Sequence, residues 1–506
     1  MKINNFSKIT SNILGSRLTG FIRDVLLANF LGANLLSDAF LFAYRLPNLF
    51  RRIFAEGAVN SVFIPMYVNL EKENKKLSND FIWFIFIIFF IFTGLLTIFV
   101  IVFNDNVISI LAPGFVDNKS QFNLASILLP ITFPFLIFVT LSAILSSVLN
   151  TKGSFFLPSF LSVILNIFMI VSLLIYKSDS YIPLAWSMIV AGLIQLTLLF
   201  INLSFLKIIW KLSLNSFSQI LPKLVIFFKR FFYSVVGSGI VQLNIFISMI
   251  FASLVGQGSI SHIYYADRII DLPFALIAVA MSITLLPYLS KNILDENKNA
   301  EAFNQTIIFC YIFALPSSFA IFFLGSDIVQ VLFGRGEFLE SDVLITSKIL
   351  IIYSLSLPAY MIARICSQVF FSYERVDLPV KASIPTFVSN FLMCFFFYKS
   401  LGVVGLAIAG AISIWLNVLF QIFFLRRFFY SFYGKIKIIN IYKILKIIFS
   451  SFAMISVLIM IENATSLNIY LTLFFQILFG ILVFFITLKI LKLNEYKLIY
   501  KSKKFN

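Results

Sequence analysis

The stretch FIWFIFIIFFIFTGLLTIFVIVF, residues 81–103, contains no charged side chain. As an α-helix it is long enough to cross the roughly 30 Å hydrocarbon core of a bilayer. Similar apolar runs recur along the chain, which is 60% hydrophobic and only 12% charged, about half the charged fraction of a soluble domain. Long continuous runs favour helices over the alternating strands of a β-barrel. The sequence predicts an all-α, polytopic integral membrane protein.

Fourteen membrane spans are predicted from runs of this kind. The first two are the weakest by hydropathy because they contain charged residues. Their ranges are 9–32, 36–66, 81–103, 122–149, 155–176, 182–206, 230–255, 260–289, 302–325, 343–372, 380–398, 402–425, 441–461 and 467–488.

Basic residues outside these spans are distributed unequally between the two sides of the membrane. With the N-terminus in the cytoplasm, nearly all fall in cytoplasmic loops and tails, and only Lys119, Lys177, Arg335 and Lys399 fall opposite. This is the positive-inside pattern. It explains the net charge of +17 without a nucleic-acid partner and predicts that both termini are cytoplasmic.

The sequence also contains a weak internal repeat. The stretch FAYR, residues 42–45, resembles YADR, residues 265–268, at a spacing of 223 positions. This predicts two halves of six spans with the same orientation, and transporters commonly bind substrate between such halves. The predicted lobes are residues 1–215 and 216–430, followed by 431–506 with the last two spans and a cytoplasmic tail. Three further pairs are 224 positions apart: Gly32 and Gly256, Pro134 and Pro358, and Asn166 and Asn390.

Charged side chains inside the predicted spans are concentrated in the first, second and eighth spans. Such charges are costly in lipid and usually face a cavity or a partner. Asp38, Arg45 and Arg52 recur every seven residues and therefore share a helix face. The surplus of arginine indicates an anionic substrate, and its planar fork of donors suits phosphate. The candidate residues are Arg17, Arg23, Asp24, Asp38, Arg45, Arg51, Arg52, Glu56, Asp267, Arg268 and Asp271.

A structural role is the alternative for these arginines, which can pair with the nearby acids or extend to a lipid headgroup. For Arg51 and Arg52, toward the cytoplasmic end, the two readings are equally supported. No nucleophile–base pair, metal-ligand spacing or phosphate-binding glycine loop stands out, and His262 is the only histidine. We therefore expect a transporter rather than an enzyme, with no cofactor and no metal site.

Several motifs resemble those of one family. GSRLTGFIRD at residues 15–24 and RLPNLFRRIFAEG at 45–57 closely resemble the N-terminal signature of the MurJ (MviN) lipid II flippases. APGF at 112–115 and YYADR at 264–268 are also similar, and the resemblance covers essentially the whole chain. It implies the fold of the multidrug/oligosaccharidyl-lipid/polysaccharide exporter superfamily, in which two six-helix lobes form a V around a cationic cavity. The two extra helices would form a groove for the lipid tail.

The resemblance also implies a function, which is moving lipid II from the inner to the outer leaflet of the bacterial inner membrane. Lipid II and membrane lipids would be partners, and other cell-wall synthesis proteins are further candidates. Some relatives hold sodium with an acid in the seventh helix, but residues 240–255 contain no acid, which argues against a sodium site. Membrane potential is another candidate energy source. The family's essential cavity charges fall on Arg17, Arg23, Asp24, Asp38, Arg51, Arg52, Glu56 and Arg268, and Arg45 matches a position that is basic in relatives.

Four other functions remain open from the residues alone. A polysaccharide-lipid flippase of the same superfamily would also have a basic cavity, whereas an exporter of cationic drugs would have acidic cavity helices. An intramembrane glycosyltransferase would need an acidic catalytic residue near a large outer loop, and the outer loops here are short. A scaffold for wall-synthesis proteins would not transport at all.

Overall fold

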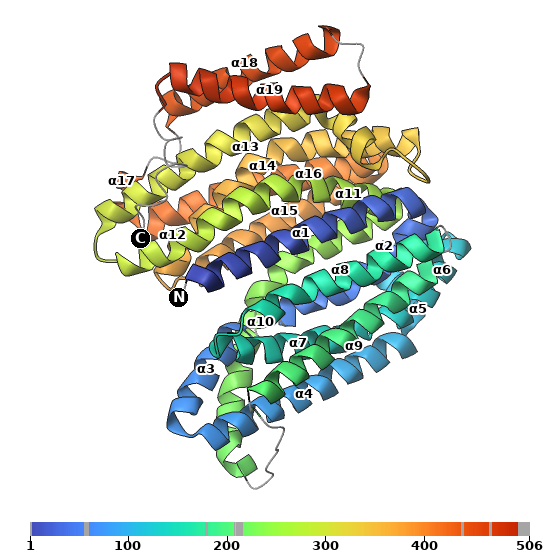
Figure 1. Ribbon diagram of the computed structural model, residues 1–506, viewed down its shortest axis with the longest axis vertical. Coiled ribbons are helices and arrows are strands. Elements are labelled where there is room, and N and C mark those ends of the chain that lie inside the picture. Colours follow the sequence, from blue (N-terminus) through green and yellow to red (C-terminus); the bar gives the residue numbers. More distant parts are fainter. Residues whose placement is uncertain are drawn as a thin grey trace. The chain divides into compact units, whose positions relative to one another are not determined.

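A computed structural model describes residues 3–54, 60–177, 181–206, 208, 216–436, 440–464 and 468–493. For 3–14, 60–61, 236–238 and 240–241 it describes the backbone alone. Within these ranges every regular element is helical, which confirms the all-α prediction. Figure 1 shows their arrangement. The elements are α1 (Ile3–Leu31), α2 (Leu35–Arg51), α3 (Asn60–Glu73), α4 (Lys75–Val102), α5 (Asn104–Leu111), η2 (Pro113–Phe115), α6 (Lys119–Thr132), α7 (Phe135–Thr151), α8 (Phe156–Tyr176), α9 (Tyr181–Phe205), α10 (Phe217–Val255), α11 (Ser259–Phe274), η5 (Ala275–Val279), α12 (Ala280–Lys291), α13 (Glu296–Phe333), α14 (Glu340–Ser372), α15 (Asp377–Ser400), α16 (Gly402–Phe428), α17 (Tyr430–Lys435), α18 (Ile441–Ala464) and α19 (Ile469–Ile490).

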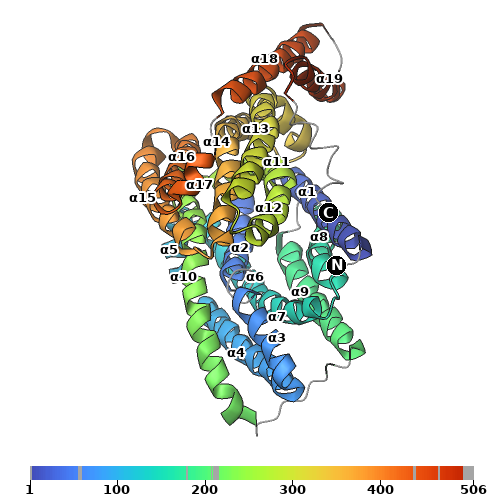
Figure 2. The ribbon, with the colours of Figure 1, turned by 90° about the vertical axis from the view of Figure 1, so that its left-hand side faces the viewer.

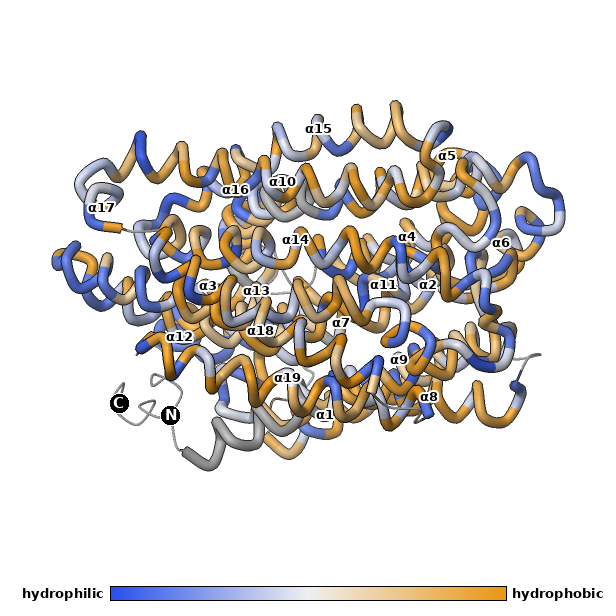
Figure 3. The backbone as a smooth tube through the Cα atoms, turned by 90° about the horizontal axis from the view of Figure 1, so that it is seen from above, coloured by the Kyte–Doolittle hydropathy of each residue, from blue (hydrophilic) through white to orange (hydrophobic). Residues whose placement is uncertain are grey.

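Many of these helices can cross a membrane. In the described part of the chain, 11 helical segments are long and apolar enough to do so, and Figure 3 shows hydrophobic residues along the long helices, with hydrophilic ones gathered at many of the turns. The other three predicted spans coincide with α1, with α2 and α3, and with α10. The first two carry charges, and the apolar part of α10 is shorter, Gln242–Val255. The count of 14 therefore stays a prediction.

Local sequence signals set the boundary between α1 and α2. Gly32 ends α1 with a φ of +63°, a left-handed conformation that a residue without Cβ adopts at little cost. Asn34 then caps α2, because its side chain accepts hydrogen bonds from the backbone N–H groups of Leu36 and Ser37. The Ser37 hydroxyl accepts from the Asn34 N–H at 2.8 Å and completes a capping box.

Proline interrupts two of the predicted spans. The predicted span 122–149 consists of α6 and α7, which are separated at Phe133 and Pro134. The predicted span 260–289 consists of α11, a five-residue π-helical segment, η5, and α12. Pro273 lies two residues before this segment, and its missing N–H disturbs the regular α-helical ladder there.

The chain forms two compact units. Unit 1 contains Met1–Ser261 together with Gly336–Phe338, and unit 2 contains His262–Arg335 together with Leu339–Asn506. In unit 1, α8 packs between α1 and α9, and α7 packs against α4 and α9. A core rich in buried aromatic residues, including Phe63, Phe81, Trp83 and Phe227, joins α3, α4 and α10. The lobes predicted from the repeat, 1–215, 216–430 and 431–506, stay a prediction.

Unit 2 is built around α13 and α14, which pack along each other. α14 also contacts α16, and α16 packs on α15. The hairpin of α18 and α19 lies against α13, where Leu324, Leu458 and Leu473 form a small buried cluster. Figures 1 and 2 both show this hairpin beside α13.

Candidate substrate-binding site

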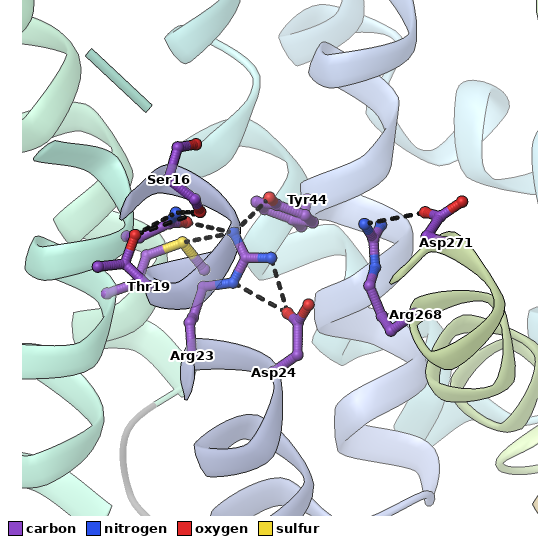
Figure 4. Close-up of polar contacts among 9 residues, drawn as sticks. Ser16, Thr19, Arg23, Asp24, Tyr44, Arg268 and Asp271 are labelled. Atoms are coloured by element: carbon purple, nitrogen blue, oxygen red, sulfur yellow. Dashed lines mark hydrogen bonds and ion pairs between the residues drawn. The ribbon is translucent and has the colours of Figure 1, made fainter. Parts of the chain in front are cut away.

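Arg23 in α1 is buried and held by several side chains. It is only 5% exposed, and its Nε and Nη2 donate to Oδ1 of Asp24 at 3.0 and 2.7 Å. Its Nη1 donates to the Tyr44 hydroxyl at 2.8 Å, as Figure 4 shows, and to Oδ1 of Asn166 at 2.9 Å. The guanidinium of Arg23 is thus held by hydrogen-bond acceptors from α1, α2 and α8.

Asn166 fixes α8 against α1 beside this guanidinium. Its Nδ2 donates to the backbone oxygen of Ser16 and to the hydroxyl of Thr19, both at 3.2 Å. Gly20 allows this approach, because an added Cβ there would already contact the Asn166 amide. The accepting oxygen and the donating nitrogen of this one amide group therefore set both the spacing of the helices and the direction of Arg23.

The remaining predicted arginines of unit 1 differ in exposure. Arg17, two turns before Arg23, is exposed, Arg45 and Arg51 are half-buried, and Arg52 is exposed at the end of α2. Nε of Arg51 donates to Oδ1 of Asn48 at 3.3 Å. Glu56, the remaining candidate of the second predicted span, lies outside the described residues.

Asp38 lies in the first turn of α2, before Tyr44, the residue of this helix that binds Arg23. It is 0% exposed, and its Oδ1 accepts hydrogen bonds from the backbone N–H and the hydroxyl of Ser261 at 2.8 and 2.6 Å. Gln121 contributes a longer contact of 3.5 Å. In this arrangement the carboxylate caps the N-terminus of α11, where backbone N–H groups lack partners within their own helix.

In unit 2, α11 carries the other predicted charges. Nη1 of Arg268 lies 3.6 Å from Oδ2 of Asp271, and the guanidinium stacks 4.6 Å from the ring centre of Tyr264. Figure 4 shows the ion pair. The Arg268 and Asp271 side chains are 27% and 49% exposed, and Asp267 is half-buried. Arg268 is therefore oriented by its neighbours yet remains partly accessible.

Unit 2 contains a further arginine that is not among the residues predicted from the sequence. Arg364 in α14 is exposed, and its Nε donates to the Ser282 hydroxyl of α12 at 3.3 Å. One turn earlier, the Tyr360 ring lies 6.1 Å from that of Phe274 in α11. Arg364 falls within the predicted span 343–372, so the rule that selected the other charges could have found it.

The described residues contain no group of three or more His, Cys, Asp or Glu side chains that could hold a metal ion. They do contain arginines in the predicted spans, Arg23 and Arg268, that lie against carboxylates and aromatic rings. Such pairs can exchange partners, since a phosphate offers the guanidinium fork the same acceptor geometry as a carboxylate.

The long apolar helices and their buried or half-buried charges define a polytopic membrane protein of the transporter type. Its fold is similar to that of a multidrug resistance MATE family transporter of the MOP superfamily, with a TM-score of 0.65 and 16% identity over 83% of this chain and 96% of the other. A family model described as lipid II flippase MurJ matches residues 27–480. The chain belongs to the MurJ family.

Individual relatives agree with this assignment. A chain from Buchnera aphidicola subsp. Schizaphis graminum, named "Probable lipid II flippase MurJ", is 36% identical over 88% of this chain and 85% of its own length. A relative of the same name from Aquifex aeolicus is 35% identical over 79% of each chain. A solved structure of lipid II flippase MurJ in an inward closed conformation superposes with a TM-score of 0.83, at 29% identity, over 96% of this chain and 98% of the other.

Proposed function

We propose that this protein moves lipid II, the polyprenyl-pyrophosphate-linked disaccharide-pentapeptide of peptidoglycan synthesis, from the inner to the outer leaflet by alternating access. The observation that carries the proposal is the set of arginines inside the spans, namely those of α1, α2 and α11. Their positive charge in a medium of low dielectric constant favours a ligand with concentrated negative charge. The names of the relatives then indicate which pyrophosphate lipid it is.

The exposure of the arginines suggests which of them would contact the pyrophosphate directly. Arg17 is exposed and Arg268 is partly accessible, so these two would contact the pyrophosphate directly. Arg23 would join them when Asp24 is displaced or shared, because its Nε and Nη2 already donate side by side to one carboxylate oxygen. The carboxylates would hold the guanidinium groups in place in the empty state and take them back after release.

The lipid tail would stay in the bilayer during transfer. The hairpin of α18 and α19 exposes large apolar side chains, among them Phe449, Phe452 and Phe474, and in a membrane these side chains meet lipid. We assign this hairpin to the polyprenyl tail, so that only the headgroup crosses between the two halves of the repeat.

The cellular setting follows from the same proposal. We place the protein in the bacterial inner membrane with both termini in the cytoplasm, as the distribution of basic residues favours. Membrane potential acting on the arginine cluster is the energy source we favour. Lipid II, surrounding membrane lipids and other cell-wall synthesis proteins are the partners we expect.

Complementation tests this function in cells. Bacteria depleted of their own lipid II flippase would be supplied with this chain, and lipid II reaching the outer leaflet would be measured with a lipid II-cleaving enzyme added outside. We expect growth and outer-leaflet lipid II to recover together. Normal amounts of the protein in the membrane without any recovery of outer-leaflet lipid II would contradict the proposal.

A further inference from the structure

Two loops, which the predicted topology places on the outer side, dock against helix ends through their backbones. The first loop contains Gly114 in η2, whose N–H donates to the Ser253 hydroxyl near the end of α10 at 3.2 Å. The second contains Gly336 and Glu337, and the Glu337 N–H donates to the backbone oxygen of Asn29 near the end of α1 at 2.9 Å. All these residues belong to unit 1, although the helices that flank the second loop, α13 and α14, belong to unit 2.

Both docking contacts require glycine. A Cβ added to Gly114 would overlap the backbone oxygen of Ser253, and one added to Gly336 would overlap that of Asn29. Gly336 also has a φ of +62°. From the other side of the second contact, a Cβ on Gly32 would overlap the backbone oxygen of Glu337. These loops therefore approach more closely than any other residue type permits.

The two contacts are images of each other under the internal repeat. Asn29 and Ser253 are 224 positions apart, and Gly114 and Gly336 are 222 apart. Each contact thus joins a loop of one half of the sequence to the first helix of the other half. Ser37 and Ser261, also 224 apart, meet each other with their hydroxyl oxygens at 2.9 Å, as expected of equivalent residues on a pseudo-twofold axis.

We infer that Gly114 and Gly336 form a pair of symmetry-related latches that hold the outer side of the transporter closed and must separate when it opens outward. The inference rests on the proposed function, because alternating access requires an outer side that opens and closes. Contacts that join the two halves of a parallel repeat are the ones such a movement breaks. Backbone docking without long side chains can close tightly and still release, since few groups lose a partner.

The first experiment measures opening without measuring transport. In a background with Cys310→Ala, Cys366→Ala and Cys394→Ala, Ser37→Cys places a thiol at the position of Ser37, which is 1% exposed. A membrane-impermeant maleimide added outside intact cells then reports how often the outer side opens. We expect Gly336→Ala to raise the alkylation rate several-fold.

Gly256→Ala is the matched control for backbone strain. Gly256 is the repeat equivalent of Gly32, has a φ of +137° and has no neighbour within 4 Å of an added Cβ. We expect it to leave the alkylation rate unchanged. Equal rates in Gly336→Ala, Gly256→Ala and the parent would overturn the latch.

The second experiment leaves both glycines in place. In the same cysteine-free background, Asn29→Cys with Glu337→Cys would be joined by a short bifunctional thiol reagent with a reducible spacer, and the reconstituted protein assayed with lipid II in liposomes. We expect the link to stop flipping and reduction to restore it. As a control, Glu71→Cys with Lys152→Cys links an ion pair within the first half of the repeat and should leave flipping intact.

Flipping at the parent's rate by protein linked between positions 29 and 337 would overturn the inference. If the parent itself moved no lipid II, the proposed function would fail, and the alkylation rates at Ser37→Cys would still decide whether the latches exist.

Discussion

The Asp38 carboxylate in α2 and Ser261 in α11 are joined by two hydrogen bonds to one oxygen, at 2.8 Å from the backbone N–H and 2.6 Å from the hydroxyl. Both residues are 0% exposed. The helix α11 therefore begins under a cap supplied by another helix rather than by its own preceding residue. The same helix later carries Arg268, so this cap fixes the start of a helix that we assign to substrate binding.

Asp38→Ala should destabilise the protein, because it removes the acceptor of both bonds. Loss of an N-terminal cap typically costs about 1 kcal/mol, and a buried donor left unpaired costs about 1–3 kcal/mol. We expect a lower thermal unfolding temperature in detergent, whereas Asp38→Asn keeps one acceptor oxygen and should lose less. Asp117→Ala, at an exposed position between η2 and α6, is the control, and an unchanged unfolding temperature for Asp38→Ala would contradict the assigned cap.

Arg23→Ala should abolish complementation and also lower stability, since Asp24 is then buried without the guanidinium. Removing one partner of a buried pair typically costs about 3–5 kcal/mol. The double substitution Arg23→Ala with Asp24→Ala also removes the buried carboxylate of Asp24, so we expect this variant to regain stability but not flipping. Full complementation by Arg23→Ala at normal expression would contradict the proposed site. Recovery of flipping in the double variant would show that the role of Arg23 is structural.

Arg364→Ala should reduce flipping to an extent similar to Arg268→Ala, because both are accessible arginines within spans of unit 2. The loss should appear at normal expression, since the contact of Arg364 with the Ser282 hydroxyl, at 3.3 Å, is a long hydrogen bond whose loss should cost little stability. Lys348→Ala is the matched control, as an exposed cation on the same helix. Equal complementation by all three variants would remove Arg364 from the site.

A photoreactive phenylalanine analogue at position 452 should capture the polyprenyl tail. Phe452 is 54% exposed on α18, with its ring 5.3 Å from that of Phe319 in α13. The same analogue at position 90, which is 52% exposed on α4, tests ordinary lipid contact. We expect adducts with lipid II at position 452 well above those at position 90, whereas equal yields would argue against the assigned tail groove.

The helical membrane fold could be predicted because the length of each apolar run is read directly from the sequence and can be compared with the thickness of a bilayer. It did not predict where helices break within a span. Phe133 and Pro134 separate α6 from α7, and the π-helical η5 follows Pro273, yet Pro358 lies within the continuous helix α14. Whether a proline ends a helix depends on which neighbouring groups satisfy the freed carbonyl, and this is tertiary information.

The sequence also indicated which charged residues lie in the predicted spans, but not which residues they contact. Periodicity grouped Asp38 with Arg45 and Arg52 on one face, but burial separates Asp38, at 0% exposure, from the exposed Arg52. Arg23 binds Tyr44 and Asn166, which lie 21 and 143 positions away in the chain. The internal repeat picked out both residues, but it did not indicate that they contact Arg23, because only the packing of α1 against α2 and α8 brings them together.

Flipping by the purified protein tests the central claim most directly. The full chain would be reconstituted in liposomes holding fluorescent lipid II, and in parallel with a lipid-linked polysaccharide precursor, and leaflet exchange would be followed by quenching from outside. We expect exchange of lipid II that far exceeds that of the other lipid and that is lost in the double variant Arg23→Ala with Asp24→Ala. Absence of lipid II exchange by folded protein, or equal exchange by the double variant, would contradict the account.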